Sequence, residues 1–202
     1  MASLATDLVI VDTGCANIGS VYFACQRLGA QATVSRDTKL ITQAKRVILP
    51  GVGTANNAMA KLQQADLITT LQQLQQPVLG ICLGMQLLTQ YSEEGNVDCL
   101  KLISGKVAAM PSETVRLPHM GWNTLSHIQP HPLLSGITEQ DYFYFVHSFA
   151  VAPNEYTLAS CNYGHDFSAV IAKDNIAGAQ FHPERSGKAG AKLLTNFLKW
   201  QL

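Results

Sequence analysis

Residues 78–88 read VLGICLGMQLL. The first three, Val78-Leu79-Gly80, are typical of a β-strand, and Met85-Gln86-Leu87-Leu88 is compatible with a helix. A strand that passes into a helix through Gly-x-Cys-x-Gly has the pattern of a nucleophile elbow, with a thiol in place of the usual hydroxyl. The pattern predicts a sharp turn that leaves Cys82 at the carboxyl edge of a sheet, where the flanking glycines permit close backbone approach.

The first half of the chain alternates strand-like and helical patterns around this turn. Short β-rich runs predict strands over residues 8–11, 32–35, 47–49 and 78–80. Apolar residues at helical spacing predict helices over 18–28 and 54–76, and six glutamines within 63–76 are expected on a solvated helix face. Strands that alternate with helices indicate an α/β protein whose parallel sheet is covered on both faces.

The second half changes to short strand-like pieces separated by Pro, Gly and Asn. These pieces are residues 114–117, 142–146, 168–172 and 176–180, and a helix is predicted over 188–200. They predict a mixed or antiparallel extension of the same sheet. No linker or internal repeat divides the sequence, so we expect one domain over residues 1–202 with an open, mostly parallel, twisted sheet.

Charge and hydropathy exclude several classes of partner. The chain has 14 Lys+Arg against 14 Asp+Glu, and its 14% of charged residues is well below the roughly 25% of an average domain. A net charge of zero lacks the basic excess of a nucleic-acid binder. No apolar run approaches the roughly 20 residues that span a bilayer, and the run at 8–11 is too short for a signal-peptide core. We therefore expect a cytoplasmic protein without nucleic-acid or membrane partners.

The cysteines point to a reducing compartment. They are five in number and contain no C-x-x-C pair, so neither a disulfide framework nor a Cys-rich zinc site is indicated. No His, Cys or carboxylate pair shows the short ligand spacings of zinc sites, and we expect no metal and no cofactor. A free cysteine is usually a buried core residue, which we expect of Cys15, Cys25, Cys99 and Cys161.

Cys82 differs from the other cysteines because it stands between a strand and a helix. The positive end of a helix lowers a thiol pKa, and free N–H groups, including that of Leu83, can face a developing oxyanion. A buried core cysteine is the alternative interpretation.

A base for this thiol is found in His182-Pro183-Glu184, directly after the predicted strand over 176–180. Residues two apart in an extended segment share a face, so Glu184 can fix the tautomer of His182 and stabilise its imidazolium. A polar turn is the alternative for an isolated triplet. The other histidines lack this combination of a preceding strand and a carboxylate two residues later.

A second glycine turn follows the third predicted strand. Pro50-Gly51-Val52-Gly53 begins at the same sheet edge, and its backbone N–H groups could complete an oxyanion hole opposite the elbow. A phosphate loop would need a following Gly-Lys-Ser/Thr, which is missing.

These three motifs together resemble those of the class I glutamine amidotransferases with a Cys-His-Glu triad, whose architecture is flavodoxin-like, and the resemblance covers essentially the whole chain. Three further stretches resemble the branch of that family that forms the glutaminase subunit of imidazole glycerol phosphate synthase. They are Pro118 to Asn123, Tyr144 to Phe149, and Asp12-Thr13-Gly14 with Asn17. Departures at Thr13, Cys15 and Phe149 do not touch the triad.

The resemblance implies a role for each matching residue. Cys82 would attack the carboxamide of L-glutamine to give a thioester and ammonia, His182 would transfer the protons, and Glu184 would orient His182. Val52, Gly53 and Leu83 would form the oxyanion hole, which a reorientation of the Val52 peptide would complete. Substrate contacts would come from Gly51, Gln86, Glu94, Ser148 and Phe149; a solvated turn is the alternative for Glu94.

The resemblance also implies a partner. A (β/α)₈ cyclase subunit would receive the ammonia through a tunnel and use it in histidine biosynthesis. Asn17, His119 and Trp122 resemble positions near that contact, although the aromatic residue could equally be core. Two other functions stay open: the glutaminase subunit of another ammonia-using synthase, and a catalytically silent flavodoxin-like binding module.

Overall fold

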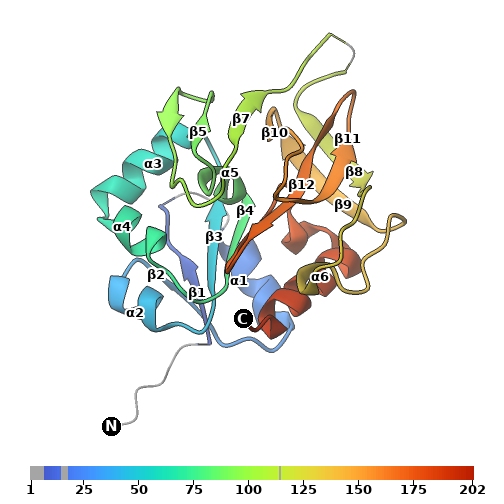
Figure 1. Cartoon of the computed structure of the whole chain (residues 1–202). Coiled ribbons are helices and arrows are strands. Elements are labelled where there is room, and N and C mark those ends of the chain that lie inside the picture. Colours follow the sequence, from blue (N-terminus) through green and yellow to red (C-terminus); the bar gives the residue numbers. More distant parts are fainter. Residues whose placement is uncertain (1–6, 15–17, 114) are drawn as a thin grey trace.

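The computed structural model describes residues 7–14, 18–113 and 115–202, and its centre is a seven-stranded sheet (Figure 1). The strand order is β11-β12-β13-β4-β3-β1-β2. Five strands run parallel: β1 (Leu8–Val11), β2 (Ala32–Ser35), β3 (Val47–Gly51), β4 (Val78–Cys82) and β13 (Ile176–Ala179). Two antiparallel strands, β12 (Asp166–Lys173) and β11 (Thr157–Asn162), extend the sheet at one edge. The predicted mostly parallel sheet is confirmed.

Successive residues of the central strands point to opposite faces of the sheet, and each face has its own hydrophobic core. Leu8 and Ile10 pack on the side covered by α1 (Ile18–Arg27) and α6 (Gly187–Lys199). Val9 and Val11 face the opposite core, which residues of four further helices complete: α2 (Thr38–Gln43), α3 (Ala55–Gln64), α4 (Leu67–Gln72) and α5 (Leu83–Leu87). Burial on both faces explains why these strands read as continuous apolar runs.

The predicted extension of the sheet is only partly right. Strands β12 and β13 join the central sheet, but the other strands after α5 that precede β11 form two separate sheets. The strands β5 (Tyr91–Ser92), β6 (Val97–Asp98), β7 (Lys106–Ala109) and β10 (Phe149–Val151) make a small sheet of their own. A hairpin pairs β8 (His119–Thr124) with β9 (Tyr142–His147). The strand predicted over 114–117 is wrong where the structure describes it: residues 115–117 form no strand, and β8 begins only after Pro118, which lacks the N–H that a ladder needs.

Two helix predictions also need correction. The helix expected over 54–76 is two helices, interrupted where Asp66 adopts a left-handed conformation with φ of 53°. The apolar stripe runs through both, which is why periodicity alone did not reveal the break. The short helix α2 was not predicted because it buries only Ile41, although Asp37 caps it by accepting from Lys39 N at 2.7 Å.

Two 3₁₀ turns, Pro132–Leu134 and Pro183–Arg185, complete the elements. Among the residues that the structure describes, no helix combines the length and hydropathy needed to cross a bilayer.

Candidate active site

The turn between β4 and α5 places Cys82 in an unusual backbone conformation. Its φ of 53° and ψ of −112° lie where non-glycine residues are rarely found. Gly84 allows α5 to rest directly on β3, because a Cβ built there would lie 1.8 Å from the Leu49 carbonyl oxygen. Gly51 is equally confined, since its Cβ would lie 2.7 Å from Gly84 N. The two glycines let the elbow form, and Cys82 remains 8% exposed.

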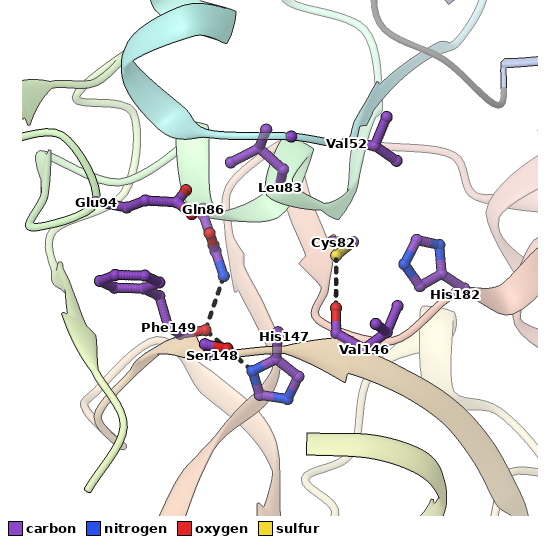
Figure 2. A pocket seen from close by; sticks show the side chains of 11 residues that line it. Val52, Cys82, Leu83, Gln86, Glu94, Val146, His147, Ser148, Phe149 and His182 are labelled. Carbon is purple, nitrogen blue, oxygen red and sulfur yellow. Dashed lines mark hydrogen bonds between the residues drawn. The ribbon is translucent and has the colours of Figure 1, made fainter. Parts of the chain in front are cut away.

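The second motif reaches Cys82 because β13 pairs with β4. This pairing carries the residues after β13 to the same sheet edge, and Figure 2 shows the His182 ring beside the Cys82 sulfur. His182 Nδ1 lies 2.8 Å from Glu184 Oε1, so the predicted contact is present, but Glu184 makes it from the 3₁₀ turn Pro183–Arg185 and not from an extended segment. The Glu184 side chain is 1% exposed, and its Oε2 accepts no hydrogen bond from the described residues.

The electrostatics favour a charged imidazole at this position. Burial disfavours the imidazolium, but hydrogen bonds with Cys82 and Glu184, and the charges of both groups, outweigh it and raise the pKa of His182 to about 10. An imidazolium held between a sulfur and a carboxylate can stabilise a thiolate and can later donate its proton.

Cys82 and His182 open onto a cavity of about 230 Å³ (Figure 2). Its lining includes all residues predicted for the oxyanion hole, Val52, Gly53 and Leu83. It also includes every predicted substrate-binding residue except Gly51: Gln86, Glu94, Ser148 and Phe149. Gly51 lies just behind this wall, paired with Cys82 across β3 and β4. A cavity smaller than the roughly 300–1,000 Å³ of drug-sized sites suits a small metabolite.

Two polar residues of the lining are held in place by hydrogen bonds. Gln86 is buried, and its Nε2 donates to the Phe149 carbonyl and to Gln180 Oε1, both at 2.9 Å. Glu94 Oε2 accepts from the backbone N–H of Ala55, in the first turn of α3, at 2.9 Å. Glu94 is therefore ordered by a helix end, and the solvated-turn alternative does not describe it.

Sequence reasoning missed three residues around the sulfur. The Val146 carbonyl lies 3.9 Å from Cys82 Sγ, His147 lines the cavity, and Gln180 Nε2 donates toward Cys82 Sγ at 3.8 Å. Gln180 is fully buried and stands two residues before His182. The shared face of residues two apart was a signal that could have found it.

The residues predicted near a partner lie in different surroundings. Trp122 is 55% exposed on β8. His119 is only 3% exposed and stacks on Tyr163 and Phe145, with ring centroids 4.1 and 4.9 Å away, so its side chain is interior. Asn17 lies outside the described residues.

The remaining cysteines carry no sign of reactivity where the structure describes them. Cys25, Cys99 and Cys161 are buried and unpaired, as expected, and Cys15 lies outside the described part of the chain. In residues 7–14, 18–113 and 115–202, no group of three or more His, Cys, Asp or Glu side chains could hold a metal ion.

Comparison with known proteins identifies a family. Residues 9–200 match the model of the class-I glutamine amidotransferases. The imidazole glycerol phosphate synthase subunit HisH of Haemophilus influenzae (strain 86-028NP) is 57% identical over 194 residues, covering 96% of this chain and 98% of that protein. The subunit of the same name from Pasteurella multocida (strain Pm70) is 54% identical over 193 residues, covering 96% and 98%.

Solved structures share the fold at low sequence identity. A crystal structure of a glutamine amidotransferase aligns with a TM-score of 0.73 at 17% identity, covering 95% of this chain and 97% of the other. The glutaminase domain of Trypanosoma brucei CTPS with bound acivicin aligns with a TM-score of 0.63 at 14% identity, covering 94% and 90%. These alignments confirm the predicted architecture.

Proposed function

Since the chain belongs to the class-I glutamine amidotransferases, we propose that it is the glutaminase subunit of an imidazole glycerol phosphate synthase and acts in histidine biosynthesis. The observation that carries the proposal is a strained cysteine that faces a buried, carboxylate-bound histidine across a small cavity. The names of relatives more than 50% identical supply the synthase to which the subunit would belong. The family match over residues 9–200 supports one amidotransferase domain for the whole chain.

The first half of the proposed reaction forms a thioester. The Cys82 thiolate attacks the carboxamide carbon of L-glutamine, and the oxyanion of the tetrahedral intermediate is met by backbone N–H groups at Leu83 and in the Val52–Gly53 turn. The His182 imidazolium protonates the carboxamide nitrogen, the C–N bond breaks, and ammonia leaves.

The second half releases glutamate. A water molecule attacks the thioester carbon while the now neutral His182 takes one of its protons, and the C–S bond breaks to restore the Cys82 thiolate. Glu184 accepts from His182 Nδ1 throughout, which fixes the ring orientation and keeps Nε2 directed at the reacting atoms. Glu184 itself need not be protonated in either step.

Substrate binding is assigned to the far side of the cavity. The Glu94 carboxylate carries a negative charge to match the α-ammonium group of glutamine, and Gln86 stands beside it. Ser148 and Phe149 offer backbone groups along the opposite wall, and Gly51 supports the turn that carries Val52. A substrate held by its α-amino-acid end would direct its carboxamide toward Cys82.

A (β/α)₈ cyclase subunit is the proposed partner and the consumer of the ammonia. One face of the β8–β9 hairpin supports this, because Met120, Trp122 and Tyr142 are 62%, 55% and 58% exposed on it. Exposed aromatic and Met side chains gathered on one face are typical of interfaces. The strand β9 that carries this face also brings the Val146 carbonyl to the Cys82 sulfur. A cytoplasmic location agrees with the unpaired cysteines of the described residues.

The test is glutamate release from glutamine, measured for the chain alone, with the cyclase, and with the cyclase and its ligand. We expect weak hydrolysis alone and strong stimulation by the liganded cyclase. Cys82→Ala should lower the rate by on the order of 10³-fold or more, whereas Cys25→Ala, a change at a buried cysteine away from the cavity, should retain activity. Turnover by Cys82→Ala at the wild-type rate would refute the mechanism, and no glutamate under any condition would favour a silent binding module.

A further inference from the structure

A pair of buried histidines lies behind the cavity wall, outside the proposed triad. His119 of β8 and His147 of β9 are directly opposite each other in the hairpin register, and His119 Nδ1 lies 3.1 Å from His147 Nε2. Their exposed fractions are 3% and 7%, and the Phe145 and Phe167 rings pack against both. A hydrogen bond between two imidazoles in such surroundings requires one nitrogen to donate and the other to accept.

The protonation of His147 is determined by a backbone carbonyl group. His147 Nδ1 lies 3.0 Å from the Phe149 carbonyl oxygen, which can only accept, so Nδ1 carries a proton. Gln86 Nε2 donates to the same oxygen from α5. The Phe149 carbonyl is therefore held by a donor from each side, one of them on the helix that follows the nucleophile.

The protonation of His119 is determined by the side-chain amide of Asn123, whose orientation is fixed by other hydrogen bonds. Asn123 Oδ1 accepts from Thr124 N at 2.8 Å, and its Nδ2 donates to the Asn162 carbonyl at 3.0 Å. The same Nδ2 lies 3.4 Å from His119 Nε2, which must then accept. With Nε2 unprotonated, the proton of His119 resides on Nδ1 and is donated to His147 Nε2.

Both ends thus require the same arrangement, in which each ring is neutral and protonated at Nδ1. A second proton on either ring would bring two N–H groups face to face in a buried site. Burial acts in the same direction, since it lowers the pKa of His119 to about 4 and that of His147 to about 3.

We propose that His119 and His147 are positioning residues: a neutral pair, locked as Nδ1–H tautomers, that holds the corner between β9 and β10 against α5. This corner is His147–Phe149, and it forms the cavity wall opposite α5, where Ser148 and Phe149 line the cavity (Figure 2). The Ser148 carbonyl is also held, by Met110 N at 2.9 Å. His119 does not line the cavity and acts only through His147.

The consequence for catalysis rests on the proposed glutaminase function. Loosening this corner should weaken glutamine binding more than it slows the chemistry, because Cys82 ends β4 and His182 follows β13, so neither residue belongs to the corner His147–Phe149. We therefore expect the pair to influence KM and to leave kcat nearly unchanged.

Two substitutions of His119 separate hydrogen bonding from packing. His119→Phe keeps a ring to stack on Tyr163 but removes the donor, whereas His119→Asn loses the ring and keeps an N–H near the position of Nδ1. With the cyclase present, we expect KM for glutamine to rise about tenfold in His119→Phe with kcat within about twofold, and to stay within about threefold of wild type in His119→Asn. A pair that served only packing would reverse the order of the two variants and overturn the proposal.

The tautomers themselves are tested without any activity. Long-range ¹⁵N–¹H correlation spectra of the full chain at neutral pH, labelled on histidine nitrogens, report the protonation of each ring nitrogen. We expect two neutral histidines protonated at Nδ1; in His119→Phe one set of signals should disappear and that of His147 should shift. An Nε2–H or cationic pattern for either residue would overturn the proposal. A chain without glutaminase activity that still shows the Nδ1–H pair would disprove the proposed function alone.

Discussion

Gly84→Ala tests whether close packing at the elbow limits which residues this turn accepts. The first turn of α5 rests on the end of β3, and the added Cβ would lie 1.8 Å from the Leu49 carbonyl oxygen and 2.9 Å from its carbon. The atoms that the added Cβ would meet are backbone atoms of β3, so no side chain can rotate to make room. Gly84 does not have a positive φ, and the expected cost is therefore one of space alone.

The size of the effect follows from that distance. Ordinary contacts between heavy atoms are about 3.5–4.0 Å, so β3 and α5 would have to separate by roughly 1.5 Å or more. The shift would be transmitted to the pairing of Gly51 with Cys82. Overpacking typically costs 1–3 kcal/mol and more when the backbone must move, so we expect a loss of about 3 kcal/mol or more in the free energy of unfolding. Most domains have only about 5–15 kcal/mol in total.

The measurement is urea unfolding followed by circular dichroism, with Gly19→Ala as the matched control. Gly19 lies in α1, and the nearest described atom to its added Cβ is Phe23 Cε2 at 4.0 Å. Alanine is the better helix former, so the control should be neutral or up to about 1 kcal/mol more stable. If Gly84→Ala unfolded at the same urea concentration as Gly19→Ala, the account of the elbow as a close-packed turn would be wrong.

Three further outcomes are expected. Iodoacetamide at neutral pH should modify Cys82 and spare the other cysteines that the structure describes, as peptide mass spectrometry after labelling would show. The reason is that burial raises the pKa of Cys25 to about 12, that of Cys99 to about 11 and that of Cys161 to about 12. Folding lowers the pKa values of His119 and His147, so between about pH 6.5 and pH 4 only the unfolded state takes up their protons. As the pH is lowered through this range, the free energy of unfolding should therefore decrease, by up to about 2.7 kcal/mol per pH unit for the two residues together. Urea unfolding at several pH values measures this slope, and an equal slope in His119→Phe would contradict the assignment. Trp122→Ala should weaken the binding free energy for the cyclase, measured by calorimetry, by about 2 kcal/mol. The control Leu40→Ala removes an exposed apolar side chain from α2 and should leave this binding free energy unaltered.

Local patterns were sufficient for the parts of the site that depend on neighbouring residues. The elbow around Cys82 could be predicted because strand, glycine turn and helix follow one another directly. The contact between His182 and Glu184 was predicted from their separation of two residues, but the extended segment assumed for it is wrong, because Glu184 lies in the 3₁₀ turn Pro183–Arg185. The break at Asp66 could not, since the apolar period continues across it.

Pairing between distant segments determined the rest. The sequence by itself determined a thiol at a strand end, a histidine with its carboxylate, and an alternating α/β order. Only the tertiary structure placed β13 beside β4, which brings His182 to Cys82 and joins Gln86 to Gln180 across 94 residues. The register of the β8–β9 hairpin likewise buried His119 against His147. The physical reason is that strand order and register depend on contacts over the whole sheet, which no local pattern encodes.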